Sequence, residues 1–314
     1  MMQSVTAFAP ATVSNVACGF DVLGFALGAP GDEVSVTPAG SGVHIDAISH
    51  DGGRLPRDVY RNTAGIAARV LLQRIGHPGG VALSIRKGLP LSSGLGGSAA
   101  SAVAAVVAID ALFHTNLPLD ALLECAFAGE QAGAGSAHAD NIAPCLYGGF
   151  VLVRRALPPD IVRLPVPPGL TAVVIHPDLE IETARARALL GDTVSLTAAT
   201  QQWANLGALV DALHRGDFDL LARSLEDVIA EPRRASLIPG FARIQRAALD
   251  AGALGCSLSG SGPAIFALCR NHGVGVAVKT AMEAAVRQHI RGDFQSYISG
   301  IAPEGARVLS TCGS

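Results

Sequence analysis

The sequence predicts an α+β protein built in two parts. Three observations support this: the chain has 314 residues, strand-like alternation gives way to helical patterns and returns, and a proline-rich stretch lies near the middle. Five prolines fall between residues 158 and 168. Because proline lacks an N–H donor and restricts its neighbour, this segment is expected to be a connection or an edge. We place the domain boundary there, with one domain over 1–165 and the other over 166–314.

Composition narrows the class of protein. Hydrophobic residues make up 49% of the chain and aromatic residues only 4%, so the core must be built mainly from Ala, Val, Leu and Ile. The formal net charge is −3 and the basic residues are scattered, which argues against a nucleic-acid partner. The first basic residue is Arg54, whereas a secretory or transit peptide needs early positive charge. The most apolar stretch, 99–113, is too short to span a bilayer. We therefore expect a cytoplasmic protein without a membrane partner.

The first half is expected to begin with strands. Residues 33–37 and 43–47 alternate apolar and polar side chains. A helix is predicted over 62–75, with Asn62 or Thr63 as its N-cap and Gly76 as its stop. The order then continues with a strand at 81–86, a glycine-rich loop, an alanine-rich helix at 98–113, a second helix at 119–131 and a strand at 148–154.

The second half has the same mixed character. Neither an internal repeat nor a low-complexity tract is present in the sequence. The patterns predict a strand at 171–175, helices near 182–190, 194–214 and 238–252, strands near Cys256 and Ile265, a helix near 274–290 and a last strand near 306–310. Both halves thus combine strands with helices, as the fold class requires.

The glycine-rich loop is the most informative segment. Its glycines remove side chains, so that backbone N–H groups can approach an anion, and the helix that follows adds its free N–H groups and the positive end of its dipole. A serine at the start of that helix can offer a hydroxyl to a metal ion. The sequence therefore predicts a phosphate-binding loop, made of Pro90, Leu91, Ser92, Ser93, Gly94, Leu95, Gly96, Gly97, Ser98, Ala99 and Ala100.

Other phosphate-binding motifs fit this loop less well. A Walker loop needs a lysine after the glycines, and none is present. The spacing of Gly94, Gly96 and Ala99 fits a dinucleotide fingerprint, but that motif requires the strand to run straight into the first glycine, and four residues intervene here. A flexible loop whose serine merely caps the next helix is the plain structural alternative.

The loop carries a family resemblance. The string from Pro90 to Ala100 is similar to the ATP loop of the small-molecule kinase superfamily that contains galactokinase, homoserine kinase, mevalonate kinase and phosphomevalonate kinase. Gly97 stands where the usual form has a first serine, and Ser98 remains. The resemblance implies a two-domain small-molecule kinase fold, with a ribosomal-protein-S5-domain-2-like ATP-binding domain followed by a ferredoxin-like α/β sandwich domain. It also implies ATP as co-substrate and Mg²⁺ as cofactor.

Three further strings extend the resemblance over nearly the whole chain, and the first two of them are similar to the homoserine kinase branch. The first spans 9–24 and includes Ser14-Asn15 and Gly19-Phe20-Asp21. The second, 138–144, reads H-A-D-N-I-A-P, and the third, 255–264, is rich in glycine and serine and resembles the third motif of the superfamily. The glycines of the third string are expected to let a backbone turn pack close to the phosphate loop. Without the family, that string reads as a strand–turn–strand.

The resemblance assigns the catalytic residues. Ser98 and Glu130 are expected to hold Mg²⁺ against the β- and γ-phosphates. Galactokinase and mevalonate kinase have an aspartate at the position of Asn141, and an asparagine cannot take a proton at neutral pH. The resemblance therefore implies that Asn141 positions the hydroxyl of the substrate, without a dedicated carboxylate base. Its neighbour Asp140 is the alternative base.

Two residues near the phosphate loop each have two possible roles. Asn62 matches a family contact to adenine or ribose, and helix capping explains it equally well. Lys87 precedes the loop, and we expect a solvated surface lysine there rather than a contact with a phosphate.

The resemblance also assigns the substrate side. L-homoserine carries a carboxylate, an ammonium group and a hydroxyl. Thr183 and Arg187 are one helical turn apart, and Arg234 lies in an E-P-x-R string similar to that of the family. The two arginines are expected to bind the carboxylate, because a guanidinium can bond both of its oxygens. The ammonium group is assigned to Asp21, and the hydroxyl end to Asn15, His138 and Asn141.

The expected function is the phosphorylation of the side-chain hydroxyl of L-homoserine, a step towards threonine. Two alternatives stay open at this point. One is another alcohol kinase of the same superfamily, acting on mevalonate, galactose or shikimate. The other is a non-catalytic descendant that binds ATP. The family also implies a homodimer.

Overall fold

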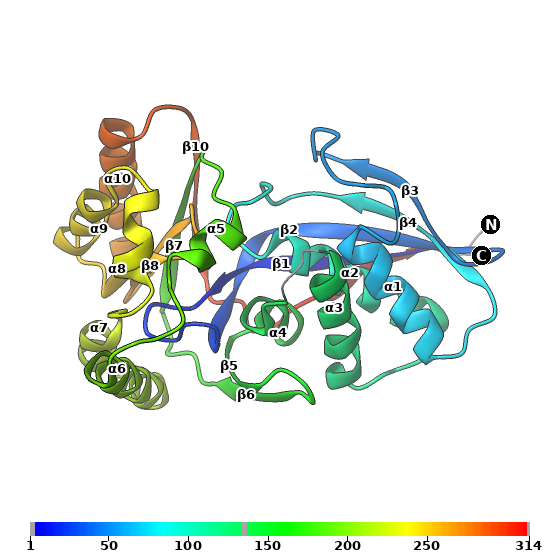
Figure 1. Ribbon diagram of the computed structural model, residues 1–314, viewed down its shortest axis with the longest axis horizontal. Helices are drawn as coiled ribbons and strands as arrows, with labels where there is room; N and C mark the ends of the chain where they lie inside the picture. The colour runs from blue at the N-terminus through cyan, green and yellow to red at the C-terminus, as the bar shows by residue number, and fades with distance from the viewer. Residues whose placement is uncertain (1–3, 134–136, 313–314) are drawn as a thin grey trace.

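The computed structural model describes residues 4–133 and 137–312 (Figure 1). It confirms an α+β architecture with two sheets. Within these residues the larger sheet has seven strands and the smaller one has four. The larger sheet contains β1 (Ser4–Ser14), β2 (Leu23–Ala39), β3 (Val43–Ser49), β4 (Gly80–Arg86), β5 (Phe150–Arg155), β6 (Asp160–Leu164) and β11 (Arg307–Cys312). The smaller sheet contains β7 (Thr171–Pro177), β8 (Gly255–Leu258), β9 (Ile265–Cys269) and β10 (Phe294–Gly300).

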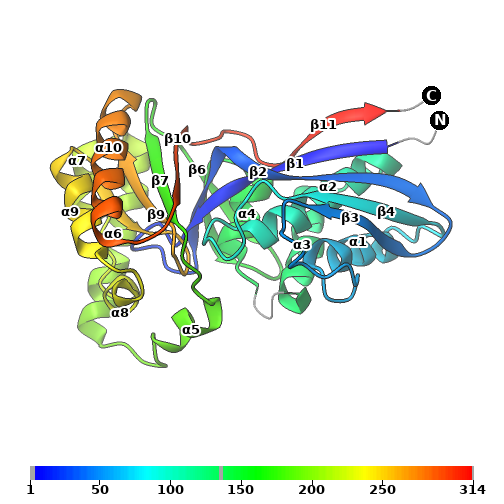
Figure 2. The same ribbon diagram turned by 90° about the horizontal axis from the view of Figure 1, so that it is seen from above.

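The larger sheet is organised around β2. Its order is β11-β1-β2-β4-β3. The first three residues of β2, Leu23–Phe25, also pair with β5, and β5 in turn pairs with the edge strand β6. Every pairing is antiparallel except that of β3 with β4. The proline-rich segment, expected to be a connection or an edge, contains the edge strand β6. The last strand, β11, pairs with β1, so residues 307–312 lie in the sheet of the first half (Figure 2).

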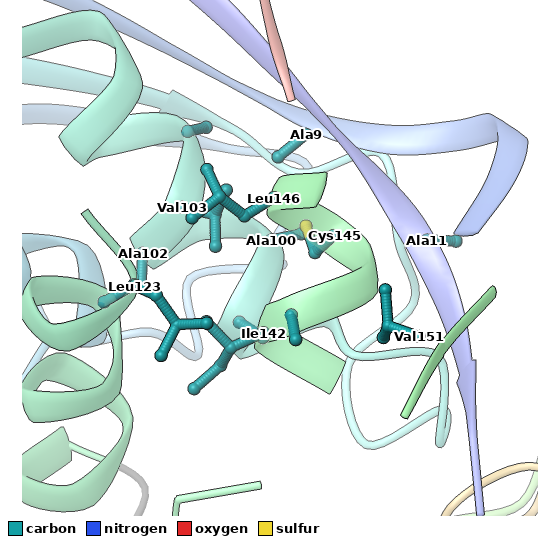
Figure 3. Packing of buried hydrophobic residues seen from close by; sticks show 14 of the residues in the cluster. Ala9, Ala11, Ala100, Ala102, Val103, Leu123, Ile142, Cys145, Leu146 and Val151 are labelled. Atoms are coloured by element: carbon teal, nitrogen blue, oxygen red, sulfur yellow. The ribbon is translucent and has the colours of Figure 1, made fainter. Parts of the chain in front are cut away.

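Four helices from the first half cover one face of the larger sheet (Figure 2). They are α1 (Thr63–Arg74), α2 (Gly97–Phe113), α3 (Leu119–Gly133) and α4 (Ala139–Tyr147). Helix α2 lies between the sheet and α1 and α3, and is therefore apolar nearly all round. Its alanines leave room for close packing, and Figure 3 shows Ala100 and Val103 of α2 beside Ile142 and Cys145 of α4.

Helix α4 was not predicted, and its sequence explains why. Pro144 lies inside it, where a proline removes a backbone N–H and is normally read as a stop. The carbonyl of Asp140 therefore lacks its usual partner four residues on. The backbone of β2 approaches it so closely that a Cβ on Gly24 would lie 2.0 Å from this oxygen. This short helix carries Asp140 and Asn141.

The remaining helices gather at the end of the molecule that holds the smaller sheet (Figure 1). The sequence predicted α5 (Thr183–Ala188), α6 (Leu196–Arg215), α9 (Phe241–Asp250) and α10 (His272–His289), but not α7 (Phe218–Ser224), α8 (Glu231–Arg234) or the 3₁₀ turn at Ala235–Leu237. Helices α9 and α10 pack on one face of the smaller sheet. None of the helices in the described ranges is both long and apolar enough to cross a membrane.

The smaller sheet is covered on both faces, which explains the unbroken burial of β7. Val173 and Ile175 point into the cluster beneath α9 and α10, whereas Ala172 and Val174 join the large core of the first half. The ring of Phe266 on β9 lies 6.0 Å from that of Phe25 on β2. The two parts therefore share one apolar core, which fixes their relative position and holds the cleft between them.

Candidate active site

A cavity of about 490 Å³ lies where the two parts meet. Its walls come from the phosphate loop, the turn after β1, the ends of α3 and α4, and helices α5 and α8. Segments far apart in the chain thus converge on one space. The predicted site residues that line it are Asn15, Asp21, Asn62, Pro90, Leu91, Ser92, Ser93, Gly94, Gly96, Gly97, Ser98, Glu130, His138, Asn141, Thr183, Arg187 and Arg234.

The phosphate loop has the backbone that its glycines predict. Gly94 and Gly96 have φ of +77° and +69°, which L side chains rarely adopt, and Gly96 is the N-cap of α2. A Cβ on Gly94 would lie 2.5 Å from the Ser259 carbonyl oxygen, and one on Gly96 would lie 2.3 Å from the Thr12 Oγ1. The N-terminus of α2 therefore opens into the cavity with its free N–H groups.

Three residues of the predicted loop do not present side chains to the cavity. Leu95, Ala99 and Ala100 are fully buried in the apolar core. Any contact of theirs with a phosphate would come from their main chain. Their side chains instead anchor the loop and the first turn of α2 to the sheet.

The glycine-rich turn after β8 packs directly against the phosphate loop. The Ser259 hydroxyl donates to the Gly94 carbonyl oxygen at 2.7 Å, and the Ala264 N–H donates to that of Ser93 at 3.1 Å. The third motif, in the second half of the chain, therefore supports the loop from behind. This is the packing that the glycines of the motif predicted.

Lys87 is not the solvated surface lysine that we expected from the sequence. Only 4% of it is exposed, and its ammonium group forms an ion pair with the buried carboxylate of Asp32. It also donates to the Gly97 carbonyl oxygen at 2.7 Å and to the Ser101 Oγ at 2.9 Å. The other oxygen of Asp32 accepts from the N–H groups of Gly88 and Leu89. This network, Asp32–Lys87–Ser101, ties β2 to the first turn of α2.

Ser98 and Glu130 lie side by side at the phosphate end of the cavity. The Ser98 hydroxyl donates to Oε2 of Glu130 at 2.9 Å. The carboxylate is 4% exposed, and its Oε1 has no hydrogen-bond partner among the described residues. Burial raises the pKa of Glu130 to about 7. A buried carboxylate oxygen without a partner, beside a hydroxyl and a helix N-terminus, fits a Mg²⁺ ion, which uses one or two protein oxygens together with phosphate oxygens.

The side chain of Asn141 is held in one orientation. Its Oδ1 accepts from the Thr12 hydroxyl at 2.8 Å, and its Nδ2 donates to the Ser14 Oγ at 3.0 Å. Thr12 and Ser14 were not predicted as separate residues, although both belong to the N-terminal motif. A Cβ on Gly96 would lie 2.9 Å from the Asn141 Oδ1, so this amide adjoins the phosphate loop.

Asp140 also lines the cavity and is almost fully buried. Its Oδ2 accepts from the Asn15 N–H at 3.2 Å, while no polar atom of the described chain bonds its Oδ1. Burial raises its pKa to about 6 despite the opposing charge of His138. The side chain thus brings an unpaired carboxyl oxygen to the wall beside Asn141.

The groups predicted for the two charged ends of the substrate pair with each other. Arg187 on α5 donates to both oxygens of Asp21, at 3.0 and 2.6 Å. The Nδ1 of His138 lies 3.8 Å from the Asp21 Oδ1. Although burial acts to raise it, the pKa of Asp21 is lowered by its hydrogen bonds with His138 and Arg187. The side chain of Arg187 is 49% exposed and that of Asp21 33% exposed, and both line the cavity, so a ligand with the same two charges can reach them.

The second predicted arginine is held more tightly. Arg234 on α8 is 4% exposed and donates from Nε to the Ala186 carbonyl oxygen and from Nη1 to that of Gly260. Asn15 donates to the same Gly260 oxygen and accepts from the Asp21 N–H. The hydroxyls of Thr183 and Ser261 lie 3.4 Å apart, and both residues also line the cavity.

Asn62 caps α1. Its Oδ1 accepts from the N–H groups of Ala64 and Gly65, and its Nδ2 donates to the Pro56 carbonyl oxygen at 3.0 Å. The predicted N-cap is therefore confirmed. The alternative contact with adenine stays a prediction, and would use the cavity wall at which Asn62 lies.

The geometry agrees with comparisons to known proteins. Residues 61–149 match the model of the GHMP kinases N terminal domain, and residues 209–288 match that of the GHMP kinases C terminal domain. A curated homoserine kinase of Chlorobaculum tepidum is 46% identical over 99% of both chains, and one of Xanthomonas campestris pv. campestris is 41% identical over 98% of this chain and 95% of its own. The crystal structure of homoserine kinase from Cytophaga hutchinsonii superposes with a TM-score of 0.95 at 48% identity, covering 98% of this chain and 97% of the other.

The fold, the phosphate loop and these matches define an ATP-dependent kinase that acts on an alcohol group. More distant structures share the fold: a mevalonate kinase of L. major superposes with a TM-score of 0.69 at 18% identity, covering 93% of this chain and 94% of its own. Within this class, the identity and coverage of the curated relatives place the chain in the homoserine kinase family.

Proposed function

We propose that this protein transfers the γ-phosphoryl group of ATP to the side-chain hydroxyl of L-homoserine and releases O-phospho-L-homoserine and ADP. One observation carries the proposal. A single cavity brings the phosphate loop and the Ser98–Glu130 pair together with Asn141 and with a cation–anion pair suited to an amino acid. The curated relatives named homoserine kinase support the same substrate.

The nucleotide end is formed by backbone groups. Free N–H groups at the start of α2 bind the phosphates of ATP, and Lys87 holds the first turn of this helix through the Gly97 carbonyl oxygen. Ser98 and Glu130 would hold Mg²⁺. When bound, the ion neutralises charge on the β- and γ-phosphates. Glu130 must be ionised for this role.

The acceptor end orients the hydroxyl. Asn141, fixed by Thr12 and Ser14, bonds the substrate hydroxyl so that its oxygen faces the γ-phosphorus. The oxygen–phosphorus bond forms as the bond between the γ-phosphorus and the bridging oxygen breaks, and ADP leaves with that electron pair. The proton of the hydroxyl passes to a phosphate oxygen or to water. Asp140, with its free oxygen and raised pKa, is the alternative acceptor.

The charged end selects an amino acid. The substrate carboxylate takes the place of Asp21 on Arg187 and meets Arg234, and the ammonium group bonds Asp21, while Asn15 and His138 line the hydroxyl end with Asn141. Thr183 lies beside this pocket. The exchange keeps every charge paired, because one internal ion pair is replaced by two with the ligand. Mevalonate, galactose and shikimate lack the ammonium group that this arrangement requires.

The test is a coupled assay of ADP release with homoserine, mevalonate, galactose and shikimate as acceptors. Homoserine should give turnover at least tenfold faster than the others, since a charged group left unpaired weakens binding strongly. Turnover with mevalonate but not with homoserine would overturn the assignment of homoserine as the substrate. ATP binding without turnover of any acceptor would favour the non-catalytic alternative.

The oligomeric state, the location and the domain boundary are also proposals. The family resemblance supports the proposal of a homodimer and of a cytoplasmic location. The boundary near residue 165 separates the strands of the two sheets, except that β11 belongs to the larger one. Light scattering after size-exclusion chromatography would measure the oligomeric state.

A further inference from the structure

Both substrate-side arginines lie over the same aromatic ring. The Cζ of Arg187 is 5.5 Å and that of Arg234 is 5.2 Å from the centroid of the Phe20 ring. These distances are within the range of a cation–π contact, in which the negative face of the ring attracts a cation. Phe20 belongs to the Gly19-Phe20-Asp21 string, whose chemistry otherwise rests on Asp21 alone.

The two guanidinium groups need such a contact, because like charges in one pocket repel each other. Arg187 has Asp21 as its partner, but within the described ranges no carboxylate lies at ion-pair distance from Arg234. Its hydrogen bonds to the described residues go to two neutral carbonyl oxygens, and its side chain is almost buried. Burial lowers the pKa of Arg234, and the charge of Arg187 acts in the same direction. The ring of Phe20 offers negative potential to both cations.

The segment that carries Phe20 is rigid. The N–H groups of Val22 and Leu23 both donate to the Gly19 carbonyl oxygen, and the Asp21 N–H donates to the Asn15 side chain. A Cβ on Gly19 would lie 2.2 Å from that of Leu23, so no other residue fits this turn without movement. These contacts hold the main chain that carries Phe20 next to Asp21.

We propose that Phe20 is a positioning residue that holds Arg187 and Arg234 in the separation that one substrate carboxylate can bridge. The inference rests on the proposed function and deepens it: it makes the carboxylate of the acceptor, rather than its hydroxyl, the group that depends on Phe20. The residue itself acts through the arginines and not on the reacting atoms.

The experiment compares Phe20→Leu with the unaltered protein in steady-state assays. The KM for homoserine should rise about tenfold, the size expected for a partly desolvated cation–π contact, and the KM for ATP should stay unchanged. Phe20→Tyr keeps the aromatic face and should restore the KM for homoserine to within about twofold. The matched control is Phe294→Leu, which removes a contact of 5.0 Å with Arg287 on the far side of the smaller sheet and should change neither constant.

A second measurement separates charge from shape. A trifluorinated phenylalanine at position 20 keeps the form of the ring and withdraws its negative face, so the KM for homoserine should rise as in Phe20→Leu. An unchanged KM in the fluorinated protein, or equal changes of KM for homoserine and ATP in Phe20→Leu, would overturn the role of Phe20 while leaving the proposed function intact. A lack of homoserine turnover in the unaltered protein would overturn both.

Discussion

Arg187 and Asp21 are 166 positions apart in the chain, yet they form a two-point ion pair in the wall of the cavity, with N–O distances of 3.0 and 2.6 Å. One partner follows the first strand and the other lies on α5 in the second part. The pair bridges the two parts where the substrate is proposed to bind. It also keeps both charges partnered before any ligand enters, and in the proposed function an amino acid binds by exchanging these partners.

The first prediction concerns this pair. Arg187→Ala removes the cation for the substrate carboxylate. The resulting fall in kcat/KM for homoserine should correspond to a loss of about 2–5 kcal/mol of transition-state stabilisation, with the KM for ATP little changed. Steady-state kinetics in both substrates would measure this. Arg185→Ala is the matched control, because Arg185 is exposed on the same short helix and lies outside the cavity wall. Unchanged constants for homoserine in Arg187→Ala would remove this arginine from the site.

The second prediction concerns the metal. Ser98→Ala removes the hydroxyl of the Ser98–Glu130 pair. Because one weak oxygen ligand is then lost, the Mg²⁺ concentration needed for half-maximal activity should rise by about tenfold. Titration of activity with Mg²⁺ at fixed ATP measures the effect. Ser84→Ala, an exposed change on β4, should leave the titration as it is. A normal Mg²⁺ curve in Ser98→Ala would contradict the assigned role.

The third prediction concerns the Asp32–Lys87–Ser101 network. Lys87→Met leaves the carboxylate of Asp32 buried without a cation and should lower the free energy of unfolding by about 3–5 kcal/mol. The double variant Lys87→Met/Asp32→Asn should recover part of that loss, since no charge then remains buried. Urea unfolding curves compare the two. Arg86→Met is the control on the next residue: its ion pair with Glu33 is exposed and is worth about 0–1 kcal/mol.

The fourth prediction is a pH dependence of stability. The pKa of Asp140 rises from 3.8 to about 6 on folding, so between these values the folded protein binds more protons than the unfolded one. Stability contributed by this group therefore falls as pH rises through that window. Asp140→Asn keeps the acceptor for the Asn15 N–H and removes the charge, so it should gain about 2–3 kcal/mol over the unaltered protein at pH 8 and little at pH 4. Thermal unfolding at both pH values would test this, and an equal difference at both would exclude Asp140 as the cause.

Much of this arrangement could be predicted because local patterns decide it. The glycines at 94 and 96 define the loop, and Asn62 marks the start of α1 by its capping chemistry. The position of Lys87 could have been predicted as well. The side chains of β4 alternate inward and outward, with Ile85 buried and Arg86 exposed, so the next residue in that alternation points inward.

Other features depend on contacts that no local pattern contains. The hydrogen bonds of Asn141 with Thr12 and Ser14 join residues more than a hundred positions apart. The pairing of Arg187 with Asp21 requires the two parts to be docked. Helix α4 was missed because Pro144 signals a stop, whereas the close approach of β2 at Gly24 stabilises the helix around it. These are tertiary effects that override local preference.

The pairing of β11 with β1 has a consequence for synthesis of the chain. Until residues 307–312 emerge from the ribosome, one side of β1 presents unpaired N–H and C=O groups along the edge of the larger sheet. Such an edge can pair with another nascent molecule, so the interval before the final strand is added is the period of greatest risk of self-association. Chaperone demand should therefore last until residues 307–312 have been made, well after the ATP-binding half.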